Sequence, residues 1–471
     1  MSDHAKLTLF ETSELIRTGE LTSTELVGAL LDRISSHDDC LNAFVSVDRE
    51  AALAAARARD EELRRTGWRG PLHGIPFAAK DIIDVAGQRT SCHSRLQLEH
   101  IAAQDAQVIA RLRDEGAVLI GKTALHEFAT GGPSFDLPWP PARNPWNPAV
   151  HPGGSSSGSG VAVSAGFVPL ALGTDTAGSV RHPATVCGIV GIKPTHDAIS
   201  THGCFPLSFS LDCVGHLTRN VTDSAIALSC TVRPSMARKM GCQVSSQVPF
   251  ALMGDGLKGM RIGVPTSFHS DVDLDPEIGA AVESAIRTLG RAGASIESVE
   301  LSPLNVYTEC GRTILQAEAF AIHAERLRDR HGDYGQRGRR RLLAGAVISA
   351  SRYIRAQQIR THLIREFAAR SAHLDAVVCA SSLAFACRID DEPLVDATYD
   401  RQARTPFNVL GSPALAVPIG LSQAGLPIGV QIAGRAYGEA SVYRAARGLE
   451  RELDLDLYPS AFLDGQVSAH A

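Results

Sequence analysis

The segment "GGSSSGSG" (residues 153–160) consists only of glycine and serine, a composition typical of a flexible linker. The segment that follows it directly, "VAVSAGFVPLALG" (161–173), is apolar and predicts buried structure. A flexible spacer has no reason to lie against a core element in the middle of a chain. The junction therefore raises the question of what a Gly/Ser run does inside a folded domain.

A second serine lies in the turn-like segment "GTDTAGSVRHPA" (173–184). Ser179 follows the small pair Ala177-Gly178 and precedes a proline by four residues, a context that predicts a tight turn. Such a turn exposes the hydroxyl and directs several backbone N–H groups at one point, which is the geometry that an oxyanion hole requires. Taken alone, an ordinary strand-to-loop turn is the more frequent meaning of such a segment.

A serine nucleophile needs a base, and Lys80 is one candidate. It lies inside the apolar run "PLHGIPFAAKDIIDVAG" (71–87), where it either extends to solvent or is held in a dry pocket. Burial lowers the pKa of a lysine and leaves a neutral amine that can accept a proton. None of the 17 histidines has a sequence context typical of a catalytic base. The segment "GSSSG" (154–158) matches the G-x-S-x-G elbow by letter but lacks the apolar strand that precedes such an elbow.

Composition and charge limit the function. The chain has 471 residues, of which 44% are hydrophobic and 21% charged, as in a typical soluble globular protein. Its net charge of −5 argues against a general binder of nucleic acid or of anionic membranes. The run 161–173 is too short and interrupted to span a membrane, and the N-terminus has no signal-peptide pattern. Ten scattered cysteines without metal-like spacing indicate reduced thiols, so we expect a cytoplasmic protein with no metal site.

Strand-like and helix-like segments alternate along the chain. Thr22 and Glu25 have the spacing of a capping box and open an amphipathic helix, and Pro276 opens a later one. The predicted strands are 41–47, 117–121, 168–173, 187–194, 260–265, 295–301, 374–380, 413–420 and 427–434. The alternation predicts an α/β protein with a large mixed, mostly parallel β-sheet that helices cover on both faces.

The chain shows no internal repeat and no true linker, so we expect one compact unit. Residues 1–70 are predicted to form a helical region that packs on the core, and residues 71–471 the main domain. Within that domain, residues 307–371 are mostly helical and form a candidate lobe. Four arginines in "RGRRR" (337–341) predict the solvated start of a helix in preference to a nucleic-acid patch.

Taken together, several segments resemble the amidase signature family. They are "GIPFAAKD" (74–81), "ARNPWNP" (142–148), "PGGSSSGSG" (152–160), "GTDTAGSVRHPATVCGIVGIKPT" (173–195), "SLDCVGHLTR" (210–219) and "GSPALAVPIG…GLPIGVQIAG" (411–434). The resemblance extends from about Leu21 to Glu450. The combination is far more specific than any single Gly/Ser motif.

The resemblance implies the family's fold for 71–471 and a Ser–cis-Ser–Lys triad. Carried over by position, Ser179 is the nucleophile, Ser155 the bridging serine and Lys80 the base, with a cis peptide between Gly154 and Ser155. The Gly/Ser run is then expected to be a rigid loop that places Ser155. The family's oxyanion hole maps to the backbone N–H groups of Thr176, Ala177, Gly178 and Ser179. No metal or organic cofactor is implied.

Departures from the family pattern bear on substrate choice. Ala177 stands where the family usually has glycine, and the run reads "GGSSSGSG" where "GGSSGGS" is usual. His182 lies at a variable position, where contact with a polar substrate group and a structural role are both open. The segment "VVCASS" (377–382) replaces a frequent Thr-Pro in a region that often lines the acyl pocket. Asp175 and Arg181 flank the nucleophile and are expected to hold its loop. The candidate substrate-binding residues are Thr130, Gly131, Gly132 and His182.

The resulting hypothesis is an enzyme that hydrolyses a linear carboxylic amide, with anilides, esters or carbamates as further substrates of the same chemistry. Its partner is a small-molecule amide, with no nucleic acid and no membrane, and a homodimer is left open. One alternative is the amidase subunit of a glutamine-dependent aminoacyl-tRNA amidotransferase, although that subunit typically has glutamine where this chain has His182. The other alternative is a non-catalytic binding protein on the same fold.

Overall fold

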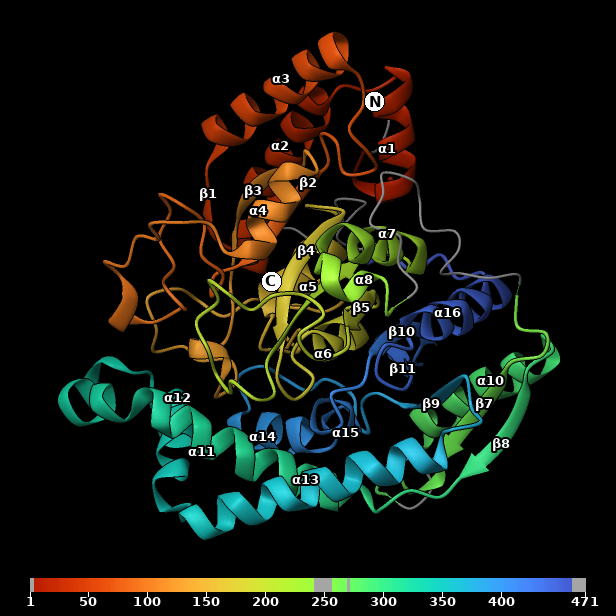
Figure 1. Cartoon of the computed structure of the whole chain (residues 1–471). Coiled ribbons are helices and arrows are strands. Elements are labelled where there is room, and N and C mark those ends of the chain that lie inside the picture. The colour runs from red at the N-terminus through yellow and green to blue at the C-terminus, as the bar shows by residue number, and fades with distance from the viewer. Residues whose placement is uncertain (1–3, 241–255, 269–271, 460–471) are drawn as a thin grey trace.

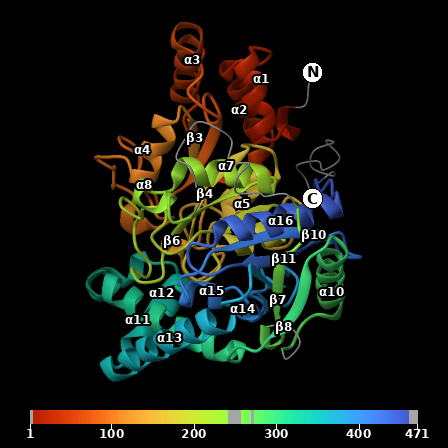
Figure 2. The same ribbon diagram turned by 45° about the vertical axis from the view of Figure 1, so that its right-hand side comes forward.

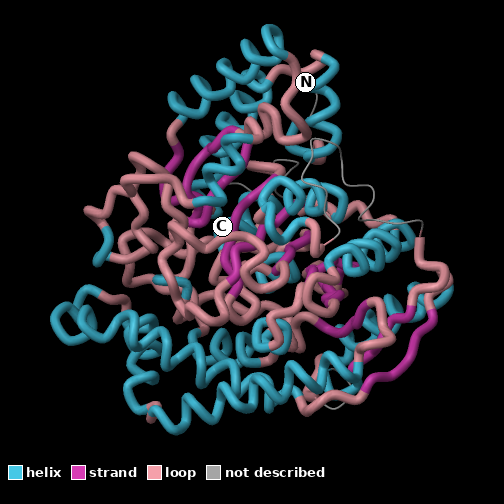
Figure 3. Tube along the Cα trace, viewed as in Figure 1, coloured by secondary structure: helices cyan, strands magenta, loops and turns pink. Residues whose placement is uncertain are grey.

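The computed structural model describes residues 4–240, 256–268 and 272–459. An eleven-stranded sheet forms its centre, in the order β1-β3-β2-β4-β6-β5-β10-β11-β9-β7-β8. The sheet crosses the molecule from β1, near the N-terminal helices, to β8 at the opposite end, with helices around it (Figures 1 and 3). The expected large mixed sheet with covering helices is confirmed.

The bounds of the elements follow the sequence pattern closely. The strands are β1 (Phe44–Val47), β2 (Pro76–Lys80), β3 (Val118–Thr123), β4 (Leu170–Asp175), β5 (Val190–Lys193), β6 (Cys213–Thr218), β7 (Arg261–Pro265), β8 (Ser295–Val299), β9 (Ala376–Ala380), β10 (Ala414–Leu421) and β11 (Pro427–Ala433). The α-helices are α1 (Leu9–Thr18), α2 (Ser23–Leu41), α3 (Arg49–Thr66), α4 (Gln107–Asp114), α5 (Ser157–Ser164), α6 (Arg181–Val186), α7 (Val221–Thr231), α8 (Pro234–Ala237), α10 (Pro276–Arg291), α11 (Leu304–Arg330), α12 (Gln336–Leu343), α13 (Ala350–Arg370), α14 (Glu392–Asp400), α15 (Thr405–Val409) and α16 (Glu439–Leu453).

The direction of the strands differs from the expectation. Of the ten strand pairings among the described residues, four are parallel and six antiparallel, so "mostly parallel" is wrong. The β4–α6–β5 segment predicts a parallel pair, but β6 lies between β4 and β5 and runs antiparallel to both. Strands β10 and β11 are joined by a short turn and therefore also pair antiparallel.

Two apolar clusters cover the two faces of the sheet. One contains the apolar side chains of α5 and α6, and the other those of α7, α10 and α16. Between these layers every residue of β2, β4, β5 and β6 is buried. No helix in the described part of the chain is long and apolar enough to cross a membrane.

The N-terminal helices α1–α3 and the helices α11–α13 lie at opposite ends of the molecule (Figures 1 and 2). The predicted capping box of Thr22 and Glu25 opens α2, as expected. Strand β1 joins the main sheet through β3, and the Asp223 carboxylate of α7 accepts hydrogen bonds from the amides of Leu9 and Phe10. These contacts tie residues 1–70 to the core, while the proposed division at residue 70 stays a prediction.

Candidate active site

Lys80 is the last residue of β2, which pairs in parallel with β4. The carboxyl ends of the two strands therefore meet at one edge of the sheet, where α/β proteins commonly place their ligands. The Lys80 side chain is fully buried, and its Nζ donates to Ser155 Oγ at 2.8 Å and to Thr174 Oγ1 at 2.8 Å. Burial lowers its pKa to about 7, against the opposing effect of the Asp212 and Asp175 charges. The lysine is thus held in a dry pocket, and a large fraction of it is neutral near pH 7.

The Gly/Ser run presents Ser155 to this lysine. The Gly154–Ser155 peptide is cis, as the resemblance implied. The Ser155 carbonyl accepts from the amide of His126, and the next amide, of Ser156, donates to the carbonyl of Ser179 at 3.2 Å. Helix α5 begins at Ser157, inside the run. The run is therefore a fixed connection between the lysine, the Ser179 turn and a buried helix.

Asp175, the last residue of β4, organises the turn that carries Ser179. Its Oδ1 accepts from the Gly178 amide at 2.8 Å, and its Oδ2 accepts from the amide of Val180 at 3.2 Å. The Arg181 guanidinium donates to both carboxylate oxygens at 3.0 Å, and both side chains are fully buried. Burial alone would raise the pKa of Asp175, but the Arg181 charge and the hydrogen bonds hold it well below its usual range. These contacts agree with the expected role of Asp175 and Arg181 in holding the loop.

The predicted oxyanion donors differ among themselves. The Gly178 amide donates to Asp175 Oδ1 and is therefore not a free donor, contrary to the expectation. The other three amides, of Thr176, Ala177 and Ser179, have no hydrogen-bond partner among the described residues, and these residues line a cavity. The arrangement leaves three donors for an oxyanion.

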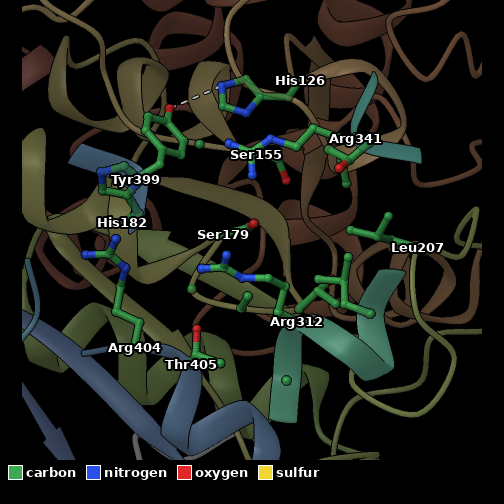
Figure 4. Close-up of a pocket in the computed structure, with 18 of the residues that line it drawn as sticks. His126, Ser155, Ser179, His182, Leu207, Arg312, Arg341, Tyr399, Arg404 and Thr405 are labelled. Carbon is green, nitrogen blue, oxygen red and sulfur yellow. Dashed lines mark hydrogen bonds between the residues drawn. The ribbon is translucent and has the colours of Figure 1, made fainter. Parts of the chain in front are cut away.

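The cavity has a volume of about 190 Å³ and contains both Ser155 and Ser179 on its wall (Figure 4). In the part of the chain that the structure describes, no hydrogen bond joins the hydroxyls of the two serines. The four candidate substrate-binding residues also lie on this wall: Thr130, Gly131, Gly132 and His182. The segment 377–382 does not line the cavity, but the Ser381 carbonyl and Ser382 Oγ support one of its arginines from behind.

Two buried histidines and a partly buried tyrosine form one side of the cavity. His126, His182 and Tyr399 lie on its wall, and the rings of His182 and Tyr399 meet edge to face at 4.6 Å. The Tyr399 hydroxyl lies 3.4 Å from His126 Nε2 (Figure 4). Burial lowers the pKa of both histidines well below the usual value, so both are neutral. His126 and Tyr399 were not predicted from the sequence, where nothing distinguishes them.

Three arginines on the cavity wall were also missed: Arg312, Arg341 and Arg404 (Figure 4). The expectation that "RGRRR" is a solvated helix start is wrong for two of its members. Helix α12 does begin there, but Arg337 is buried and donates to the Gly131 carbonyl, and Arg341 faces the cavity. Their i, i+4 spacing places both on one face of the helix, and this signal was available in the sequence.

Comparison with known proteins gives the family. The amidase family model matches residues 25–443. The chain is 36% identical to a glutamyl-tRNA(Gln) amidotransferase subunit from Roseiflexus sp. strain RS-1, over 95% of this chain and 97% of that protein.

Solved structures agree. A chain of an inhibitor-bound vestigial protein complex, described as revealing the evolutionary origins of an s-triazine catabolic enzyme, superimposes with a TM-score of 0.86 at 30% identity. The match covers 95% of this chain and 99% of that one. The native peptide amidase of Stenotrophomonas maltophilia gives 0.84 at 30% identity, covering 97% and 99%. Sequence, fold and the motifs around Lys80, Ser155 and Ser179 lead to the same conclusion: the chain belongs to the amidase family, whose members hydrolyse carbon–nitrogen bonds other than peptide bonds.

Proposed function

We propose that this protein hydrolyses a linear carboxylic amide through an acyl-enzyme on Ser179. The observation that carries the proposal is the 2.8 Å hydrogen bond from Lys80 Nζ to Ser155 Oγ in a fully buried site beside the Ser179 turn. A buried amine with a pKa near 7 is a base at neutral pH, and a serine between it and the nucleophile passes the proton.

The reaction proceeds in two halves. Neutral Lys80 takes the proton of Ser155, Ser155 takes that of Ser179, and Ser179 Oγ forms a bond to the amide carbon. The three free amides of the turn stabilise the oxyanion, and each such donor contributes about 10²–10³-fold to the rate. The relay returns the proton to the leaving nitrogen as the carbon–nitrogen bond breaks. Water, deprotonated by the same relay, then hydrolyses the acyl-enzyme. The hydrogen bond between the Ser155 and Ser179 hydroxyls forms when substrate binds, because catalytic hydrogen bonds often shorten only in the substrate complex.

Substitution of the three residues tests this mechanism. Ser179→Ala, Ser155→Ala and Lys80→Ala are each expected to reduce kcat by about 10³-fold or more, because the residues act as one unit. The readout is ammonia or amine release from a panel of alkyl amides, aryl amides, esters and carbamates. The control is Ser157→Ala in the same run, whose Oγ lies 3.5 Å from the Ala124 carbonyl and touches no member of the relay. Unchanged hydrolysis by Ser179→Ala would show that Ser179 is not the nucleophile. Full activity of Lys80→Ala would show that Lys80 is not the base.

A second candidate is the amidase subunit of a glutamine-dependent aminoacyl-tRNA amidotransferase. It is favoured by the curated relatives, several of which are named as the same glutamyl-tRNA(Gln) amidotransferase subunit, at 33–36% identity. If this candidate is right, the chain releases ammonia from glutamine only together with partner subunits. If the first is right, the isolated chain hydrolyses amides. A non-catalytic binding protein would show neither activity. A cytoplasmic location and a homodimer remain predictions.

A further inference from the structure

Arg404 differs from the other two arginines of the cavity in having no acidic partner. Arg312 Nη2 lies 3.6 Å from Asp400 Oδ1, and Arg341 Nη2 lies 3.0 Å from Asp396 Oδ1. Within the described ranges, no carboxylate oxygen lies within 4 Å of the Arg404 guanidinium. Its Nη1 donates only to neutral groups, the Ser381 carbonyl at 2.9 Å and Ser382 Oγ at 2.7 Å.

The charge of Arg404 is nevertheless buried. The residue is only 2% exposed, and its Nε has no hydrogen-bond partner among the described residues. The charge of Asp175 raises the pKa of Arg404 from a distance, but that carboxylate already accepts hydrogen bonds from Arg181 and Asn408. The neighbouring His182 is neutral because burial, and then the Arg404 charge, lower its pKa. Burial lowers the pKa of Arg404 itself only to about 9, so it stays cationic at neutral pH. A buried cation of this kind costs folding free energy that an anion in the cavity would recover.

The position of Arg404 relates this charge to the reaction. A Cβ built on Gly178 would lie 2.7 Å from Arg404 Nε and 2.8 Å from Arg404 Cβ, so the stem of the Arg404 side chain packs directly on the residue before Ser179. Gly178 has a φ of +122° and no side chain to displace the arginine. Nη1 is engaged and Nε is buried against Gly178, which leaves the N–H groups of Nη2 to donate to an anion in the cavity. A carboxylate there would accept a charge-assisted hydrogen bond and pair this buried cation.

We propose that the Arg404 end of the cavity binds the carboxylate of the substrate, which is a half-amide of a short dicarboxylic acid. This inference rests on the proposed amidase function and narrows its substrate class. It also separates the substrate from glutamine, whose ammonium group would lie next to that carboxylate and would approach three arginines. Among the described residues that line the cavity, Asp400 is the one acid, and it already pairs with Arg312. The chain is acidic overall, with a net charge of −5, so the positive cavity is a local feature.

Matched substrates test the proposal on the intact enzyme. Glutaramate, pentanamide and glutamine have carbon chains of the same length. Glutaramate has a carboxylate where pentanamide has a methyl group, and glutamine has an additional ammonium group next to that carboxylate. Malonamate and succinamate vary the distance from carboxylate to amide. The kcat/KM of the best half-amide is expected to exceed that of its neutral counterpart at least 100-fold. The kcat/KM of glutamine is expected to be lower than that of glutaramate. Equal values for half-amide and neutral amide would overturn the subsite and leave the amidase proposal intact.

Variants assign the effect to one residue. Arg404→Gln is expected to reduce the preference for the half-amide over the neutral amide, measured as the ratio of their kcat/KM values, to less than tenfold. Arg401→Gln is the control, because Arg401 lies on the same loop, donates to the Asp273 carbonyl and does not line the cavity. An Arg404→Gln protein that keeps the full preference would overturn the proposal.

A binding measurement keeps the proposal testable if Arg404→Gln fails to fold, or if no amide is turned over. Calorimetry on Ser179→Ala is expected to show binding of glutarate or glutaramate and none of pentanamide, with the affinity falling as salt is added. Absence of carboxylate binding would overturn the subsite. Carboxylate binding without turnover of any amide by the wild-type enzyme would support the subsite and count against the amidase function.

Discussion

Among single residues, Asp212 sets the working range of Lys80. Its Oδ1 accepts from Thr176 Oγ1 at 2.6 Å, and its Oδ2 accepts from the amides of Leu207 and Ser208. Burial raises the pKa of Asp212 to about 6, so it is ionised at neutral pH and its charge raises the pKa of Lys80. Because the base must be neutral, kcat/KM is expected to rise with pH through about 7.

Asp212→Asn tests this coupling. The amide keeps the shape of the carboxylate but removes its charge, so the midpoint of the acidic limb is expected to move to lower pH by a few tenths of a unit or more. The measurement is log kcat/KM between pH 5 and 9. Asp197→Asn, which removes one partner of a surface pair with Arg233, is the control and is expected to leave the midpoint in place. A midpoint that stays or rises in Asp212→Asn contradicts the coupling.

The same lysine affects stability. Its pKa of about 7 in the folded state lies below the ordinary value of 10.5, so between these values the unfolded chain binds more protons. The contribution of Lys80 to stability therefore increases as pH rises from about 7 to 10.5, and it is unfavourable at lower pH.

The sequence predicted the residues that lie in motifs but not those that packing brings to the cavity. Lys80, Ser155 and Ser179 stand in segments whose letters are unusual, and the structure places Lys80 against Ser155. Arg312 and Arg404 come from α11 and from the loop before α15. These arginines come together at the cavity because of how those segments pack at the edge of the sheet. A local sequence pattern does not predict this packing.

At the scale of elements, the position of helix α5 depends on a close approach of its first turn to the sheet. Gly158, in its first turn, donates its amide to the Ala124 carbonyl, and a Cβ there would lie 2.2 Å from the Ala43 carbonyl. Gly158→Ala is expected to destabilise the protein by about 1–3 kcal/mol through overpacking. Gly28 in α2 has no atom within 4 Å of a Cβ, so Gly28→Ala is expected to stabilise by about 0.5–1 kcal/mol.

Denaturant unfolding of the two variants separates close packing from helix propensity. Both substitutions exchange glycine for alanine inside a helix, so intrinsic propensity alone predicts the same sign for both. Equal stabilisation of the two variants would show that Gly158 does not approach the Ala43 and Ala124 carbonyls as closely as described.

Strand β6 shows why the topology was harder to predict than the fold class. Its sequence "CVGHLT" is buried on both faces and is interrupted by a glycine and a histidine, so it has neither alternation nor a continuous apolar run. Gly215 is required there because a Cβ would lie 2.1 Å from the Ile192 carbonyl of β5. The direction of the central strands followed from this one missed element.

At the scale of the whole molecule, the N-terminal region is expected to unfold together with the rest. Strand β1 extends the main sheet, and Asp223 would lose the amides of Leu9 and Phe10 if residues 1–70 were removed. We expect one calorimetric transition for the full chain and no folded, active product from a chain that begins at residue 71. Full-length Ser179→Ala serves as an inactive, folded reference. Two separate transitions, or an active truncated chain, would show that the region is an independent domain.

The Gly/Ser run leaves little freedom to substitution, although its composition is the simplest in the chain. Three of its four hydroxyls have well-defined and different partners: Ser155 Oγ accepts from Lys80, Ser156 Oγ donates to the Thr174 carbonyl, and Ser159 Oγ donates to the Leu172 carbonyl. These three serines are not interchangeable with alanine, because each substitution would remove a hydrogen bond from a buried carbonyl or amine. The run therefore contains only two residue types, but the neighbouring strands require a particular one of them at most of its positions.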